Sequence, residues 1–447
     1  MRVRIRMTLV AALAAMAAAA MAMPAGAAAA PLLPSADPFY AWSGSLAGVA
    51  PGTILRTRQV AFAEVGVSTP LSATQVLYRT TGELGQPTVT VATILRPLLP
   101  TGTTKILSYQ TAYDALGSEC DPSYTLQGGN PGYETADLEE NLMLAYVAQG
   151  DTVVTSDYEG ETLDYGAGQE SGYGTLDAIR ATENVLKAAA ASTPVALLGY
   201  SGGAIATDYA AELAPSYAPG LDLVGEAEGG VPVEYAHNLA YISGSSSWSG
   251  VIPAILVGLT RGFHVNTAPY LSAYGQQVFD QVGPECINNF LGAYPGLTMQ
   301  KLLKPQYQDY TKVPIFVKIF NRMIMSGTGT PRGPMYIGNG NADGTGDGVM
   351  IAKDVQELAH TYCQRGVSVQ FNIYKGLNHD LGIAPFETGA LNFIDARLNG
   401  RSVPDGCSQV TAGNALTPLA VPATPAKHHK AKRHKAKHHR AKRRKRR

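Results

Sequence analysis

Cysteine, tryptophan and long apolar runs are all scarce in this chain of 447 residues. The four cysteines form no C-x-x-C pair, which argues against a zinc ribbon or a redox dithiol. Beyond the N-terminal region no apolar run approaches the length that crosses a bilayer, so the sequence predicts no internal membrane anchor. Outside the last 21 residues there are only four histidines, and any catalytic base has to come from this short set: His237, His264, His360 and His379.

The N-terminus has the three parts of a secretory signal. Arg2, Arg4 and Arg6 form a basic start, an Ala/Leu/Val/Met-rich run follows, and small residues at 25–30 form a cleavage zone. We expect residues 1–30 to be a signal peptide and the mature chain to be secreted. The alternative is an N-terminal membrane anchor.

The cysteine content fits export. Four cysteines in a secreted chain are expected to form two disulfides. Their spacing leaves all three pairings open among Cys120, Cys286, Cys363 and Cys407.

A formal net charge of zero hides a strong separation of charge. Of the 35 Lys and Arg residues, 13 lie in residues 427–447, which contain no acid, and three lie in the signal region. The body between them carries 19 basic and 35 acidic residues, a net charge of −16. The tail repeats Ala-Lys every five residues, which does not fit a helix, so we expect it to be disordered behind a Pro/Ala/Thr linker at 409–426. We expect this tail to retain the protein at the cell envelope, on an anionic surface polymer or nucleic acid; the alternative is a solubilising extension.

Strand and helix patterns alternate along residues 31–408, which we expect to form one domain. Strands are predicted at 88–95, 105–109, 152–156, 223–226, 334–338 and 368–374, and helices at 141–148, 174–190, 349–365 and 386–398. This alternation predicts an α/β fold with a mostly parallel sheet and helices on both faces. Residues 31–85 are mixed, with loops punctuated by Pro34, Pro38, Pro51 and Pro70. Residues 232–313 show no strand pattern and predict a helical cap over the sheet edge, or else a second layer of core helices.

The functional prediction depends on residues 195–213. An apolar run, then Gly199-Tyr-Ser201-Gly202-Gly203, then a helical pattern form the strand–turn–helix context of a G-x-S-x-G nucleophile elbow. The turn holds the Ser201 hydroxyl away from the sheet, and glycine at 199 and 203 leaves room for chain that passes close by. The N–H of Gly202 would help to form an oxyanion hole at the helix N-terminus. The alternative is a tight turn with an incidental serine.

A serine nucleophile needs a base, and the base needs an acid that orients it. In α/β-hydrolases the acid and then the base follow the nucleophile along the chain, with the base in a loop after the last strand. His379, in the loop expected at 375–382, meets this condition. The preceding loop offers Asp347, our first choice because it lies directly before a predicted helix, and Asp343. The same loop lacks the spacing of an EF-hand calcium site.

These residues resemble the secretory lipase family typified by Candida lipase A, over about residues 40–405. The shared motifs are Ser108-Tyr-Gln with Asp114, Cys120-Asp-Pro-Ser-Tyr124, the elbow at Ser201, Asp347-Gly-Val-Met, and Tyr374 with His379. In the family the acid lies in an Asp-x-x-Val-Pro-like segment. This chain has no proline there, so Asp343 stays open as the acid.

The resemblance implies an α/β-hydrolase with a helical lid formed by the insertion after the elbow. It also implies an oxyanion hole formed by Asp114 with the Gly202 backbone. The disulfides that it implies are Cys120–Cys286 and Cys363–Cys407. The basic tail is not part of the family pattern.

We therefore expect a secreted serine hydrolase that cleaves carboxylic esters, a triacylglycerol lipase or carboxylesterase, with Ser201, Asp347 and His379 as its catalytic residues. Its substrate would be a lipid or another ester, and it would need no cofactor or metal. Two rivals remain. One is a serine peptidase or acyltransferase on the same residues, since fold and triad do not determine the acyl group. The other is a non-enzymatic envelope-binding protein that acts through its basic tail.

Overall fold

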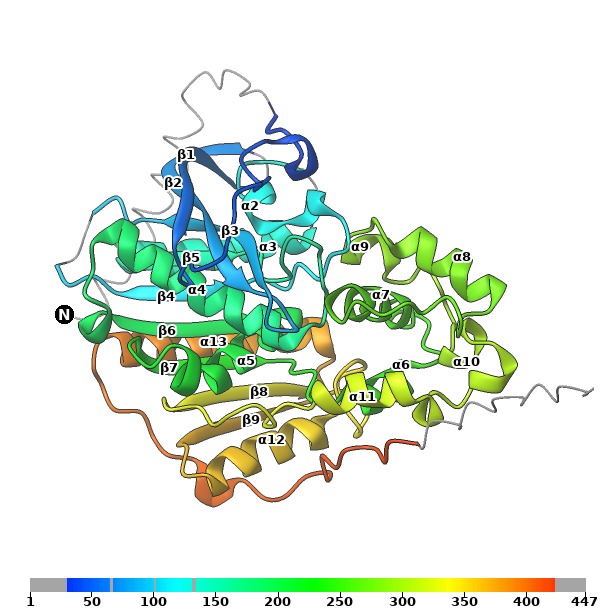
Figure 1. The fold of residues 1–447 in the computed structure, drawn as a ribbon. Helices are drawn as coiled ribbons and strands as arrows, with labels where there is room; N and C mark the ends of the chain where they lie inside the picture. The colour runs from blue at the N-terminus through cyan, green and yellow to red at the C-terminus, as the bar shows by residue number, and fades with distance from the viewer. Residues whose placement is uncertain (1–29, 65–66, 100–101, 131–133, 423–447) are drawn as a thin grey trace, which may run out of the picture.

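The computed structural model describes residues 30–422, apart from 65–66, 100–101 and 131–133. The expected signal peptide (except Ala30) and the basic tail therefore lie outside the described residues. A single nine-stranded sheet with helices on both faces organises the molecule (Figure 1). Its strands are β1 (Ile54–Glu64), β2 (Val67–Thr81), β3 (Pro87–Leu95), β4 (Ile106–Gln110), β5 (Thr152–Ser156), β6 (Pro194–Tyr200), β7 (Asp222–Gly229), β8 (Met335–Asn341) and β9 (Val369–Lys375). Among the described helices, none is both long and apolar enough to cross a bilayer.

The sheet is mostly parallel, as predicted. In the order β1-β2-β3-β5-β4-β6-β7-β8-β9, every neighbouring pair from β5 to β9 is parallel. The first three strands join antiparallel to each other and to β5. Because the carboxyl ends of parallel strands meet at one edge of a sheet, the loops after β4, β6, β8 and β9 are brought together there.

Helices cover both faces of this sheet. The main ones are α3 (Glu134–Ala148), α4 (Gly168–Leu186), α5 (Gly202–Tyr217), α12 (Ala352–Gln364) and α13 (His379–Leu398), with a short α2 (Pro122–Thr125). On one face, Leu176 and Ile179 of α4 share a buried cluster with alanines of α5 and with β3, β4 and β6. On the other face, Met143 of α3 and Phe386 of α13 share a second cluster with β4 and β6.

Between β7 and β8 the chain forms only helices and loops among the described residues, apart from one isolated bridge, Leu271–Leu303. The helices are α6 (Tyr235–Ile242), α7 (Val251–Gly262), α8 (Ala273–Val282), α9 (Ile287–Phe290), α10 (Met299–Leu302) and α11 (Pro314–Arg322). This cap lies beyond the carboxyl ends of the central strands (Figure 1). The cap extends through α11, whereas the sequence pattern predicted that it would end at residue 313.

The antiparallel hairpin β1–β2 was not predicted. The prolines of residues 31–85 favoured loops, yet Pro70 lies inside β2. The pairing explains this exception, since the register shifts between Ala61, which pairs with Ser72, and Ala63, which pairs with Ser68. Pro70 therefore lies at a bulge, where its missing N–H costs no ladder hydrogen bond.

The last helix begins seven residues earlier than predicted. Pro385 suggested a start at 386, but α13 begins at His379. The side chain of Asn378 caps it by accepting a hydrogen bond from the N–H of Leu381 (2.9 Å). His379 is thus the first residue of a helix instead of a loop residue, which fixes its backbone more firmly. The helix α4 likewise begins at Gly168, six residues before its predicted start.

The segment predicted to be a linker is docked on the body over its described part, residues 409–422, which we call the strap. It runs along α12 and then reaches α11 (Figure 1). Five side-chain hydrogen bonds of 2.7–2.8 Å hold it: Gln356 Nε2 to Thr411 O, Gly413 N to Glu357 Oε2, Asn414 Nδ2 to Asp354 Oδ1, Asn321 Nδ2 to Leu419 O, and Leu419 N to Asn321 Oδ1. Leu416 and Leu419 also pack on the hydrophobic core. A Thr/Ala/Pro-rich composition did not reveal these contacts, because the partner side chains belong to the helices.

Both disulfides form the pairs that the resemblance implied. Cys120–Cys286 joins the loop after β4 to the cap, and Cys363–Cys407 joins the end of α12 to the chain just before the strap. The bridged residues are 166 and 44 positions apart, so each bond closes a long loop. Long closed loops restrict the unfolded chain strongly.

Reducing these bonds is expected to lower the melting temperature, since a disulfide that closes a long loop contributes about 2–4 kcal/mol. Calorimetry with and without reductant measures the effect, with free thiols counted in parallel. The variant Cys363→Ser with Cys407→Ser isolates one bridge and should show an intermediate loss. An unchanged melting temperature in a protein with four titratable thiols would contradict the prediction.

Candidate active site

Ser201 lies at the sharp turn between β6 and α5. Its backbone has φ 56° and ψ −121°, a conformation that non-glycine residues rarely adopt. A backbone hydrogen bond stabilises the turn, because the Ser201 N–H donates to Gly229 O (2.8 Å) on neighbouring β7. Such local strain persists only where the surrounding structure imposes it, and it concentrates at functional sites.

The two elbow glycines have the steric role that the sequence predicted. A Cβ at Gly199 would overlap the carbonyl of Gly203 across the turn. A Cβ at Gly203 would overlap the carbonyl of Gln110, the last residue of adjacent β4. Only glycine at both positions lets strand, turn and neighbouring strand approach this closely.

Three predicted residues, from the elbow turn, the loop after β8 and the start of α13, form one chain of hydrogen bonds. His379 Nε2 lies 2.8 Å from Ser201 Oγ, and His379 Nδ1 lies 2.8 Å from Asp347 Oδ2. The His379 N–H also donates to Asp347 O (2.9 Å). Tyr200 adds a further constraint, since its hydroxyl donates to His379 O (2.7 Å). The imidazole is therefore oriented through both its ring and its backbone.

Asp347, not Asp343, is hydrogen-bonded to this histidine. Asp347 is buried, and its Oδ1 accepts from the N–H groups of Val349 (2.9 Å) and Met350 (2.7 Å), which leaves Oδ2 for His379. Asp343 is exposed and caps the turn, accepting from Thr345 N and Gly346 N. These backbone hydrogen bonds, that of Gly346 first, lower the pKa of Asp343.

The other three histidines have different partners. His237 Nδ1 lies between Asp354 Oδ2 (3.0 Å) and Glu234 Oε2 (3.3 Å), His360 lies beside Glu357, and His264 follows the end of α7.

The one described group of side chains close enough to suggest a metal is Glu119 with Cys120 and Cys286. Those two sulfurs form a disulfide and offer no thiolate ligand.

The environment of His379 changes its pKa in opposing ways. Burial lowers the pKa, whereas the charge of Asp347 and its hydrogen bond raise it, so the pKa of His379 lies above its ordinary value. The carboxylates of Asp380 and Asp114 also raise it. Burial raises the pKa of Asp114 itself to about 7.

A base with a raised pKa is already protonated at a pH closer to neutral. We therefore expect kcat/KM for a soluble ester to fall as the pH decreases, with a midpoint above about 6.5, the ordinary histidine value. Asp380→Asn removes an exposed carboxylate that raises the pKa of His379, so the midpoint of this variant should lie at lower pH. A wild-type midpoint below the ordinary value, or no shift in the variant, would contradict this electrostatic account.

Asp114 lies directly beside the elbow. It follows β4 with φ 39°, is buried, and accepts a hydrogen bond from the Tyr165 hydroxyl through Oδ2 (3.3 Å). Its Oδ1 lies against Gly202, where any Cβ would overlap it. Gly202 is the first residue of α5, so its N–H has no helical acceptor. The two residues implied for an oxyanion hole are thus in contact through the Asp114 side chain.

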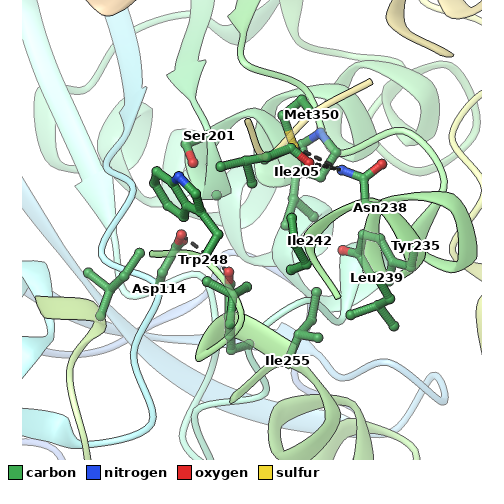
Figure 2. A pocket seen from close by; sticks show the side chains of 16 residues that line it. Asp114, Ser201, Ile205, Tyr235, Asn238, Leu239, Ile242, Trp248, Ile255 and Met350 are labelled. Atoms are coloured by element: carbon green, nitrogen blue, oxygen red, sulfur yellow. Dashed lines mark hydrogen bonds between the residues drawn. The ribbon is translucent and has the colours of Figure 1, made fainter. Parts of the chain in front are cut away.

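A small apolar cavity of about 40 Å³ adjoins Ser201 (Figure 2). Its lining combines elbow residues with cap residues: Asp114, Tyr165, Ser201, Gly202, Ile205, Pro232, Tyr235, Asn238, Leu239, Ile242, Trp248, Val251, Ile255, Ile287, Val349 and Met350. Trp248 packs edge-on against His379, with ring centroids 5.2 Å apart. Trp248 was not among the predicted site residues. Its one available signal was a lone tryptophan in a run of serine and glycine at 243–250.

Comparisons with known proteins identify the family of this chain. The profile of the family described as secretory lipase matches residues 133–406. A Mycobacterium tuberculosis protein named "Probable inactive lipase" is 33% identical, over 87% of this chain and 88% of its own. The chain belongs to the secretory lipase family. Lipase A of Arthroderma benhamiae, another relative, is 31% identical over 86% of this chain and 83% of its own.

Solved structures share the fold of this chain. Candida antarctica lipase A in its closed state superposes with a TM-score of 0.76 at 28% identity, covering 88% of this chain and 91% of that chain. An esterase from Xanthomonas oryzae shares the fold at 18% identity, with a TM-score of 0.62. These similarities establish an α/β-hydrolase fold and support a lipase or ester hydrolase. The family and its fungal members also point to secretion.

Proposed function

We propose that this secretory lipase family member is an exported serine hydrolase of carboxylic esters, with Ser201, His379 and Asp347 as its triad. The observation that carries the proposal is the unbroken path from Asp347 Oδ2 through His379 to Ser201 Oγ, with both contacts at 2.8 Å. Many structural histidines are buried, but few join a strained serine to a buried aspartate.

The reaction follows from these positions. His379 Nε2 accepts the Ser201 proton as Oγ attacks the ester carbonyl carbon, and the N–H groups of Asp114 and Gly202 stabilise the oxyanion. His379 then donates that proton to the leaving alcohol, which gives an acyl-enzyme. Water, deprotonated by His379, releases the acid and restores Ser201. Asp347 holds the imidazole in the required tautomer and stabilises its cation.

The cavity favours an apolar acyl group. Ile205, Leu239 and Ile242 form much of its wall, and few charged groups face it. Binding sites for substrate-sized ligands usually enclose about 300–1,000 Å³. A volume of about 40 Å³ therefore indicates that the cap side chains must move before a long acyl chain can enter.

Comparing the hydrolysis rates of p-nitrophenyl esters with those of peptidyl anilides tests the substrate class. We expect ester cleavage that depends on Ser201, with the anilides left intact. Added alcohol acceptors separate a hydrolase from an acyltransferase, because a transferase would form new ester in preference to free acid. Cleavage of the anilides alone would favour a peptidase, and inertness to all of these would favour a binding protein.

A further inference from the structure

The strap determines where the basic tail leaves the body. Starting beside the Cys363–Cys407 disulfide, it runs back along α12 and is last held at Leu419 by Asn321 of α11. Lys427, the first tail lysine, follows the last described residue, Pro422, by five positions. Since an extended chain spans at most about 3.6 Å per residue, Lys427 must lie within about 18 Å of Pro422.

This exit point is at the active-site end of the molecule. Asn414 of the strap binds Asp354 Oδ1, in the first turn of α12 and seven residues after Asp347. The other oxygen of Asp354 pairs with His237 of α6, the cap helix that also contributes Leu239 and Ile242 to the cavity. The strap then ends beside α11 of the cap, at the opposite end from the amino ends of the strands (Figure 1).

We propose that the strap holds the basic tail beside the cap, so that an anionic lipid surface bound by the tail faces the active site. Tail residues 427–447 carry 13 cations, whereas the acidic body alone would be repelled by such a surface. A lipid surface is the partner for which this location matters, because it would hold the ester substrate as well as the charge. A soluble polyanion would bind a tail equally well at either end of the molecule. Val421, at the end of the strap, is 50% exposed and adds an apolar contact beside the tail.

Hydrolysis in vesicles tests the geometry. A fluorogenic diacylglycerol ester is placed in phosphatidylcholine vesicles with or without phosphatidylglycerol, and p-nitrophenyl butyrate serves as the soluble substrate. Deleting 427–447 should lower the rate on anionic vesicles at least about tenfold and leave the soluble rate unchanged. Asn321→Ala with Asn414→Ala, or a Gly/Ser spacer inserted after Pro422, should keep vesicle binding and still lose most of this rate.

The controls separate the strap from general effects. Asn392→Ala with Asn399→Ala removes two exposed asparagines, one in α13 and one directly after it, whose side chains bond to Thr388 and Asp395 and not to the strap, and it should match the wild type. High salt should abolish the advantage of anionic vesicles. Wild-type rates in both strap variants, or in the tail deletion, would overturn the proposal. So would tail-dependent binding to polyphosphate or DNA with no tail-dependent binding to anionic vesicles, which would make a polymer the partner.

The proposal depends on the proposed ester hydrolysis for its substrate, so a second readout does not use activity. The chain has two tryptophans, Trp42 near β1 and Trp248 in the cap. In Trp42→Phe, brominated phosphatidylcholine in anionic vesicles should quench Trp248; in Trp248→Phe, it should quench Trp42 much less. The spacer should remove the difference. Equal quenching of both tryptophans in the unspaced chain would contradict the orientation, whether or not any ester is cleaved.

Discussion

Ser201→Ala is expected to abolish ester hydrolysis while the fold stays intact. Removing the hydroxyl removes the nucleophile, and loss of a triad serine costs roughly 10⁶-fold in kcat in comparable enzymes. His379→Ala should be nearly as damaging, because no other described imidazole is hydrogen-bonded to Ser201 Oγ. Rates on p-nitrophenyl butyrate, with circular dichroism and melting temperature as checks of folding, measure both effects.

His360→Ala is the matched control for the base. His360 lies on α12, and in the described part of the chain its side chain pairs with Glu357 and Gln364 of the same helix. Its replacement should leave the rate within about twofold, since substitutions away from special features usually have small effects. An inactive His360→Ala with an active His379→Ala would refute the assignment of the base.

Asp347→Asn is expected to lower kcat by about 10⁴-fold, with little change in the fold. The amide keeps an oxygen for the N–H groups of Val349 and Met350. It then presents NH₂ to His379 Nδ1, which favours the tautomer whose proton is on Nε2. That tautomer cannot accept the Ser201 proton. The effect should appear in kcat more than in KM, because Asp347 contacts the imidazole on the side away from Ser201.

Asp343→Asn makes the same chemical change four residues earlier. Its carboxylate caps a turn and accepts a hydrogen bond from the Tyr241 hydroxyl (2.9 Å), both of which an asparagine can largely retain. We expect less than a tenfold loss. If Asp343→Asn were the more damaging variant, the acid would have to be reassigned.

Much of the site was predictable because its signals are local. The elbow needs glycine at fixed offsets from Ser201. A Cβ at Gly199 would overlap the carbonyl of Gly203, and a Cβ at Gly203 would overlap the carbonyl of Gln110. Parallel strands bring successive loops to one edge, so chain order alone placed His379 and an aspartate near Ser201. The sequence favoured Asp347 over Asp343 by its place before a predicted helix but left Asp343 open, since the choice depends on which carboxylate the turn leaves free.

Other features depend on contacts that no local pattern records. The β1–β2 hairpin tolerates Pro70 because of a bulge in its pairing. Pro385 lies inside α13, which Asn378 caps at its N-terminus. Trp248 reaches the site from a Ser/Gly loop in the cap. The strap looks unstructured in sequence because its hydrogen-bonding partners, such as Asn321 and Glu357, lie on distant helices.

The central claim is that Ser201 is an activated nucleophile, and one relative named as an inactive lipase makes a direct test valuable. The measurement is labelling of the full mature protein with a fluorophosphonate, followed by mass mapping of the modified peptide. The account predicts one label per chain, on Ser201, with none on the Ser201→Ala variant and strong suppression in Asp347→Asn. No label on the folded wild-type protein, or a label on a serine of 243–250 in place of Ser201, would contradict it.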